Sequence, residues 1–131
     1  LRCNKIASVG GEALAALLVG GSPLESIDLE GNRIEDEGAK AWDVAIRRAS
    51  NLRVLNLRSN SIGDAGLTAL ASGLMEPGTL QTVLVWGNHF ATASKDAFAA
   101  VHASRAPGLE MDVKPYVVDG EVQLAREDVE V

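Results

Sequence analysis

The chain has 131 residues, of which 47% are apolar, and its formal net charge is −6. This composition excludes a disordered polymer and is sufficient for one domain with its own core. The acidic balance, 18 acidic against 12 basic side chains, disfavours binding to nucleic acid or to an anionic membrane surface.

A pattern with a period of 28 residues organises the chain. The clearest copy is LRVLNLRSNSI, residues 52–62, in which apolar positions alternate and are followed by an asparagine. The same columns recur one period before and after it, most visibly at Asn32, Asn60 and Asn88. The pattern predicts a short strand and a turn. It divides the chain into a partial repeat at residues 1–23, repeats at 24–51, 52–79 and 80–107, and a C-terminal segment at 108–131.

The second half of each repeat predicts an amphipathic helix, because apolar residues recur on one helical face. Trp42 falls in one of these columns and is expected in the core. Residue types that cap helix N-termini also recur at 28-residue steps, namely Ser8, Asp36, Asp64 and Thr92. We expect the asparagine column to bond turn backbone groups that no strand serves.

The pattern changes after residue 107. LEMDV, residues 109–113, predicts one last strand, and Asp119-Gly120 between two apolar runs predicts a β-hairpin. Because an end repeat exposes its apolar stripe, we interpret residues 116–124 as a hairpin cap. AREDVEV, residues 125–131, is interpreted as an acidic tail or a linker.

The repeats, with helical second halves such as IGDAGLTALASGL, resemble the ribonuclease-inhibitor-like subfamily of leucine-rich repeats. This resemblance implies an α/β solenoid, a right-handed βα horseshoe arc with parallel strands on the concave side and helices outside. It also implies a non-catalytic module that binds proteins through the concave side. The segments VWGNHF, DAFAAV and MDVKPYVVDGEVQLA resemble the C-termini of leucine-rich repeat-containing protein 34 and its relatives. That second resemblance implies an intracellular protein, cytoplasmic or ciliary, that acts as a scaffold in a large assembly.

Alternation along the strands places the residues between the core columns on the concave side. One row there carries Arg2, Glu30, Arg58 and Trp86, at spacings of about 4.8 Å, and we expect Arg58 to lie over Trp86 as a cation–π pair. A final row holds Glu110, Asp112 and Lys114. Trp and Arg are enriched at interface hot spots, and an outward Leu has no evident core role. The candidate partner-binding residues are therefore Trp86, Leu84, Arg58, Glu30, Asn56 and Asp28. The alternative is that this ladder only keeps an exposed sheet soluble.

The sequence contains few residues in patterns typical of catalytic or metal-binding sites. With two histidines, one cysteine and no paired spacing, the sequence predicts no metal and no cofactor. It has neither a G-x-S-x-G motif nor a P-loop, so we expect neither enzymatic activity nor a small-molecule substrate. Glu35, Asp36 and Glu37 are interpreted as helix-start electrostatics. His102 is interpreted as a packed or capping residue and His89 as an exposed turn residue.

The sequence also leads to expectations about the cellular compartment of the protein and about whether the chain is part of a longer one. Cys3 cannot form an intramolecular disulfide, which favours a reducing compartment. The longest apolar run, residues 13–19, is too short to span a bilayer. The chain begins with Leu1 inside a repeat, from which we expect the C-terminal part of a longer protein. Two alternative functions stay open: a GTPase-activating protein with the same repeat type, and the sensor domain of an innate-immune receptor.

Overall fold

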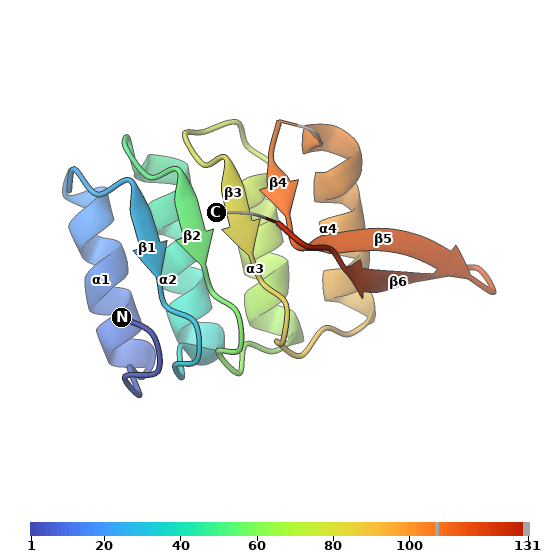
Figure 1. Cartoon of the computed structure of the whole chain (residues 1–131), viewed down its shortest axis with the longest axis horizontal. Coiled ribbons are helices and arrows are strands. Elements are labelled where there is room, and N and C mark those ends of the chain that lie inside the picture. The colour runs from blue at the N-terminus through green and yellow to red at the C-terminus, as the bar shows by residue number, and fades with distance from the viewer. Residues whose placement is uncertain (107, 130–131) are drawn as a thin grey trace.

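The computed structural model describes residues 1–106 and 108–129. Within this part of the chain, helices and strands alternate as far as β4, and a strand pair follows (Figure 1). Residue 107, where the last predicted repeat ends, and residues 130–131 of the predicted tail lie outside the described residues. The elements are α1 (Ser8–Val19), β1 (Ser26–Asp28), α2 (Glu35–Arg48), β2 (Val54–Asn56), α3 (Asp64–Leu74), β3 (Thr82–Leu84), α4 (Thr92–Arg105), β4 (Glu110–Met111), β5 (Val113–Val118) and β6 (Glu121–Arg126).

The strands β1 to β4 form one parallel sheet in the order β1-β2-β3-β4. Ser26 pairs with Val54, and Val54 pairs with Thr82. Thr82 pairs in turn with Glu110. Each step across the sheet is therefore 28 residues along the chain, the period seen in the sequence, so residues of one sequence column lie side by side.

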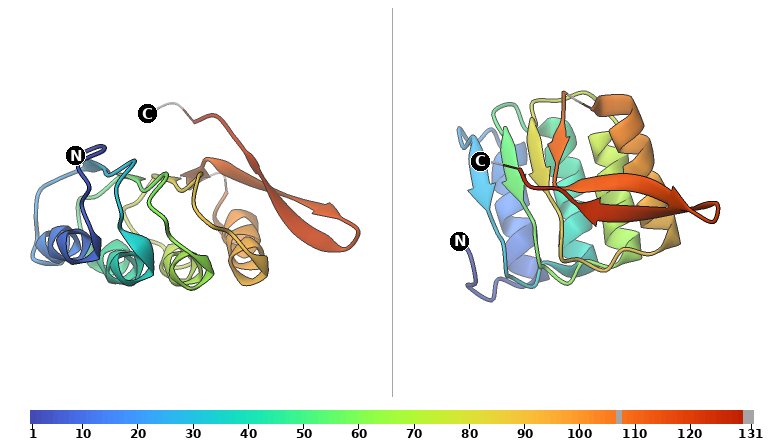
Figure 2. Two further views of the ribbon diagram at one scale, coloured as in Figure 1. Left: turned by 90° about the horizontal axis from the view of Figure 1, so that it is seen from below. Right: turned by 45° about the vertical axis from the view of Figure 1, so that its right-hand side comes forward.

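The helices α1 to α4 all cover the same face of this sheet, which Figure 2 (left) shows as two layers. We call the other, helix-free side the concave face. The predicted α/β solenoid of parallel strands and outer helices, with a β-hairpin at the C-terminus, is confirmed.

The core lies between the sheet and the helices. Leu29, Leu57 and Val85, which follow β1, β2 and β3 in the same column, are each fully buried. Trp42 of α2 and Phe98 of α4 are the largest fully buried side chains, so the prediction that Trp42 belongs to the core is confirmed. Because each helix packs mainly on its neighbours, no repeat can bury its apolar stripe alone.

The asparagine column joins each turn to the turn before it, and Asn88 is the clearest case. Its Oδ1 accepts from the backbone N–H groups of Asn60 (2.9 Å) and Ile62 (3.1 Å). Its Nδ2 donates to the carbonyl oxygens of Leu57 (2.9 Å) and Val85 (2.8 Å). All four bonds serve backbone groups, as the sequence predicts, and they use the full capacity of the amide.

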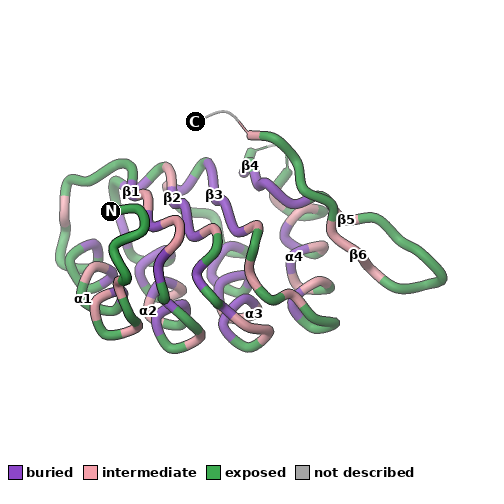
Figure 3. Tube along the Cα trace, turned by 60° about the horizontal axis from the view of Figure 1, so that its bottom comes forward, coloured by how far each residue is buried: buried purple, intermediate pink, exposed green. Residues whose placement is uncertain are grey.

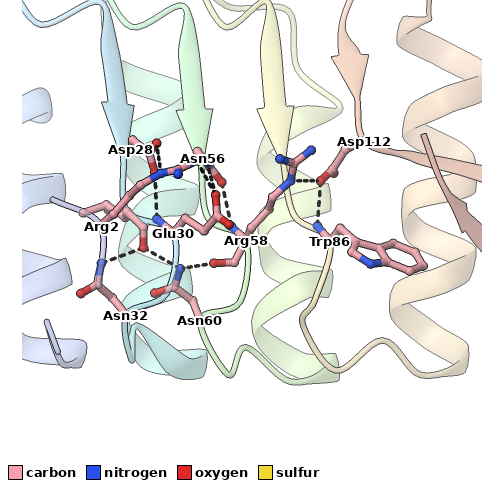
Figure 4. Close-up of polar contacts among 10 residues, drawn as sticks. Arg2, Asp28, Glu30, Asn32, Asn56, Arg58, Asn60, Trp86 and Asp112 are labelled. Carbon is pink, nitrogen blue, oxygen red and sulfur yellow. Dashed lines mark hydrogen bonds and ion pairs between the residues drawn. The ribbon is translucent and has the colours of Figure 1, made fainter. Parts of the chain in front are cut away.

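The same arrangement recurs one and two repeats earlier. Asn60 is fully buried, and its Nδ2 donates to the Leu29 carbonyl at 2.9 Å. Asn32 accepts from the N–H groups of Asn4 (2.9 Å) and Ile6 (3.0 Å). The amides therefore form a ladder through the solenoid, of which Figure 4 includes two steps.

The prediction that Ser8, Asp36, Asp64 and Thr92 cap their own helices is wrong. The helices begin at or beside these residues, but the residue before each of the four helices makes no side-chain cap bond. A capping side chain must stand one position before the helix to reach its free N–H groups. These residues already lie in the first turn.

The two aspartates bond the start of the next helix instead. Asp36 Oδ1 accepts from the N–H of Gly63, the residue before α3, at 2.6 Å. Asp64 Oδ1 accepts from the N–H of Ser94, in the first turn of α4, at 2.8 Å. Contact with the side chain and the N–H of Ser94 lowers the pKa of Asp64 below its ordinary value of 3.8. The carboxylates thus link neighbouring repeats at the positive ends of their helices.

The C-terminal prediction of a hairpin is confirmed. β5 and β6 pair in antiparallel fashion around Asp119 and Gly120, whose φ angles of 52° and 79° are those that a tight hairpin turn requires. Leu124 packs against the core beside α4, but the far half of the hairpin projects beyond the solenoid (Figures 1 and 3). Tyr116, Val117 and Val118 are exposed there, so the hairpin covers only part of the end repeat.

Replacing Asn60 with Ala should lower the free energy of unfolding by about 2–4 kcal/mol, because buried backbone groups lose their partners. Asn4→Ala is the matched control, because Asn4 lies in the same column but its side chain is exposed. Its amide donates to the Arg2 carbonyl. This substitution should cost less than about 0.5 kcal/mol. Urea unfolding of both variants measures the difference, and equal losses would contradict the role of the ladder.

Asp64 should stabilise the fold in a pH-dependent manner. Its pKa is lowered on folding, so its contribution is complete above pH 3.8 and is lost as the pH falls through the lower, folded value. The stability difference between the native chain and Asp64→Asn should be constant from about pH 7 to about pH 5 and vanish on further acidification. Urea unfolding across this range tests it, with exposed Asp96→Asn as control; a difference that persists in acid would contradict the linkage.

Candidate interaction surface

The part of the concave face in front of β1 and β2 carries charged side chains that are partly exposed. Arg2 bonds two acidic residues, Asp28 Oδ2 through Nε at 2.6 Å and Glu30 Oε2 through Nη2 at 2.7 Å. Asn56 Nδ2 donates to the same Glu30 oxygen at 3.1 Å. The predicted neighbourhood of Arg2 and Glu30 is therefore present, and Figure 4 shows these side chains converging in front of β1 and β2.

Asp28 is held as a carboxylate by its surroundings. Partial burial alone would raise its pKa, but the bonds from the Glu30 backbone N–H and from Arg2 outweigh that effect and lower the pKa. Its side chain is 40% exposed and that of Arg2 is 59% exposed. Ion pairs this open add little stability, so the charges remain available for recognition.

The expected cation–π pair between Arg58 and Trp86 is wrong. Arg58 Nε donates to Asp112 Oδ2 at 2.7 Å, and this carboxylate is fully buried. Figure 4 shows the guanidinium beside Asp112 and the Trp86 indole pointing away from it. A guanidinium gains more from a buried carboxylate than from the face of an indole, because the carboxylate carries a full charge.

Asp112 also closes the end of the sheet. In earlier repeats the N–H at this level bonds the next strand, as Leu29 does to Asn56 O and Leu57 does to Leu84 O. β4 ends at Met111, and the Asp112 carboxylate takes over, accepting from Val85 N–H (2.8 Å) and Trp86 N–H (3.1 Å). The sequence placed Asp112 in the outward row but gave no signal of this role.

Leu84 is the second correction. It was expected to be exposed on the concave face, yet it is fully buried without belonging to the main core cluster. Arg58 lies two residues after β2 and reaches Asp112 beyond β3, so its side chain crosses the strand that carries Leu84 (Figure 4). The chain after β6 also runs back over this side, where Glu127 N–H donates to Asp112 O at 2.8 Å (Figure 2). Leu84 therefore cannot serve as an exposed anchor.

Trp86 lies where the concave face ends. Its side chain is half-buried and packs against the core. It borders a groove of about 480 Å³ between the turn after β3 and strand β6, lined by Trp86, Gly87, Asn88, His89, Phe90, Lys95, Gln123 and Leu124. Sequence reasoning selected Trp86 but missed the other side of the groove, although the predicted hairpin placed a second segment near this end of the solenoid.

Comparison with known families agrees with this geometry. A family model described as Leucine Rich repeat matches residues 1–15, 22–41 and 48–71. The matched part of the chain consists of leucine-rich repeats. The match at 22–41 covers β1 and the start of α2, and the match at 48–71 covers β2 and most of α3. No curated protein matches the chain.

Leucine-rich repeats generally form non-catalytic modules that mediate protein–protein interaction. Residues 1–106 and 108–129 hold no group of three or more His, Cys, Asp or Glu side chains placed to bind a metal ion. Across the same ranges, no helix combines the length and the hydropathy needed to cross a bilayer. His89 is exposed in its turn, as predicted, and His102 is half-buried near the end of α4.

Asp112→Ala should lower the free energy of unfolding by about 3–5 kcal/mol, because it leaves Arg58 without its partner and two backbone N–H groups unbonded. Arg58→Met should also be strongly destabilising, because it leaves the fully buried Asp112 carboxylate without its counter-charge, although both backbone bonds remain. Urea unfolding of the two single variants and of the double variant gives their coupling. Additive losses would contradict a direct interaction between the two side chains.

Proposed function

We propose that this leucine-rich repeat protein is a non-catalytic scaffold that binds a protein partner along its concave face and anchors it at Trp86. The observation that carries this proposal is the position of Trp86, a large aromatic that is half-buried, fixed at its backbone by Asp112 and bordering a groove. Tryptophan at the rim of a rigid surface is a typical interface hot spot.

The charged part of the concave face, in front of β1 and β2, would orient the partner more than it would strengthen binding. Asp28, Glu30 and Arg2 form an open cluster, and Asn56 holds Glu30 in place. Exposed charges of this kind steer association and reject partners of the wrong charge. Leu84 is fully buried and Arg58 is paired with Asp112, so both leave the set of contact residues.

We further propose the finer family assignments as hypotheses. The 28-residue register and the helical second halves support a ribonuclease-inhibitor-like subtype. The closing sequence supports kinship with leucine-rich repeat-containing protein 34. A cytoplasmic or ciliary location within a large assembly follows only if that kinship holds, and fluorescence localisation of the full-length protein in ciliated cells tests it.

Two other functions of the same repeat type stay as alternatives. A GTPase-activating protein would stimulate GTP turnover by a bound GTPase without a complete active site of its own, and a GTP-turnover assay detects it. The sensor domain of an innate-immune receptor would require a nucleotide-binding domain in the same protein, which the full-length sequence decides.

Trp86→Ala should weaken the affinity for the partner about thirtyfold, the effect of losing a hot spot of roughly 2 kcal/mol. Recovery of the partner should fall accordingly. Cross-linking of the full-length protein in cells, followed by identification of the linked proteins, measures this loss. Tyr116→Ala is the matched control, since it removes an aromatic that is 49% exposed on the projecting hairpin. Equal recovery with native protein and Trp86→Ala, with both variants folded, would sink the proposal.

A further inference from the structure

The groove beside Trp86 is lined by apolar and by basic side chains. Trp86, Phe90 and Leu124 are all half-buried and packed against the core. Lys95 of α4 and the exposed His89 also line the groove. Among the described residues, no acidic side chain lines the groove, although the chain as a whole has a net charge of −6. The local charge there is therefore opposite in sign to that of the whole chain.

Lys95 keeps most of its binding capacity. Its Nζ donates to Gln123 Oε1 at 3.0 Å, which uses one of three N–H groups. Among the described residues, no carboxylate forms an ion pair with it. Lys95 also lines the neighbouring hollow along β6, together with Asp96 and Glu121. Charge therefore favours an anion on the Trp86 side of Lys95 and disfavours it on the other side.

The groove is rigid before anything binds. The Phe90 ring packs edge-on against the buried Phe98 ring, at a centroid distance of 5.3 Å and an angle of 84°. Gly87 has a φ of 84°, and a side chain there would meet Ser59 Oγ at 2.6 Å, so the turn is held close to the preceding repeat. The Asn88 amide has no free capacity. A preformed site loses little entropy on binding.

Strand β6 offers main-chain bonds along the same groove. In the described chain it pairs only with β5, so its other edge bonds no strand. Figure 1 shows β6 lying between β5 and the segment that leads into α4, so the unpaired edge faces the groove. An extended peptide can bond such an edge as an additional strand.

We propose that this groove binds an extended acidic peptide segment of the protein partner. An apolar side chain of the segment packs on Trp86, Phe90 and Leu124, and a neighbouring carboxylate pairs with Lys95 beside His89. This inference rests on the proposed function at Trp86 and specifies the chemistry of the partner. Charge complementarity and the unpaired strand edge select the peptide over an uncharged ligand.

Fluorescence polarisation with a labelled hexapeptide of alternating Leu and Glu tests the proposal on the full chain. The matched peptide with Gln in place of Glu should bind at least tenfold more weakly, and Lys95→Gln should weaken the Glu peptide about tenfold, as expected for loss of one close ion pair. Lys40→Gln, the same change on the exposed face of α2, should leave binding unchanged. Binding should also weaken with salt.

The proposal would be overturned by no saturable binding of the Glu peptide, by equal binding of the Glu and Gln peptides, by insensitivity to Lys95→Gln, or by a protein dimer that excludes the peptide. Sodium glutamate at the same carboxylate concentration should compete poorly; full competition would assign the site to free carboxylates instead. If the peptide fails while partner recovery still depends on Trp86, the proposed function stands and the groove inference falls.

Discussion

The ladder of asparagine amides is the interaction on which the rest of the structure depends. Each repeat must turn sharply between strand and helix, and the turn leaves backbone N–H and carbonyl groups that no strand can bond. Asn32, Asn60 and Asn88 bond these groups to the repeat before, so every turn is completed by the next one. The ladder thereby fixes the register in which all other columns align.

Once that register is fixed, the helix starts follow. Asp36 and Asp64 each reach the beginning of the next helix, where unpaired N–H groups favour a negative charge. The amide ladder on one side and these carboxylates on the other connect the same neighbouring repeats. Polar contacts between repeats therefore recur along the chain, as the apolar packing between them does. Both kinds of contact lack a next repeat where the repetition stops.

The end of the repetition explains why the candidate site lies where it does. β4 is short, and the chain leaves the sheet at Asp112, whose carboxylate replaces the missing strand for Val85 and Trp86. Arg58 neutralises this buried charge and so is unavailable to a partner. The departing chain forms the hairpin that makes the second wall of the Trp86 groove. The repeats supply a rigid frame, and the irregular end supplies a surface with distinct chemistry.

The sequence by itself determined the period, the parallel register, the buried columns, the role of the asparagines and the C-terminal hairpin. These features repeat or are local, so a pattern of residue types is enough to predict them. Only the tertiary structure decided the partner of Arg58, the burial of Leu84 and the second wall of the groove. Arg58 and Asp112 are 54 residues apart and their contact occurs once. A periodic pattern carries no information about a contact that breaks the period, because the fold brings those two side chains together only where the period ends.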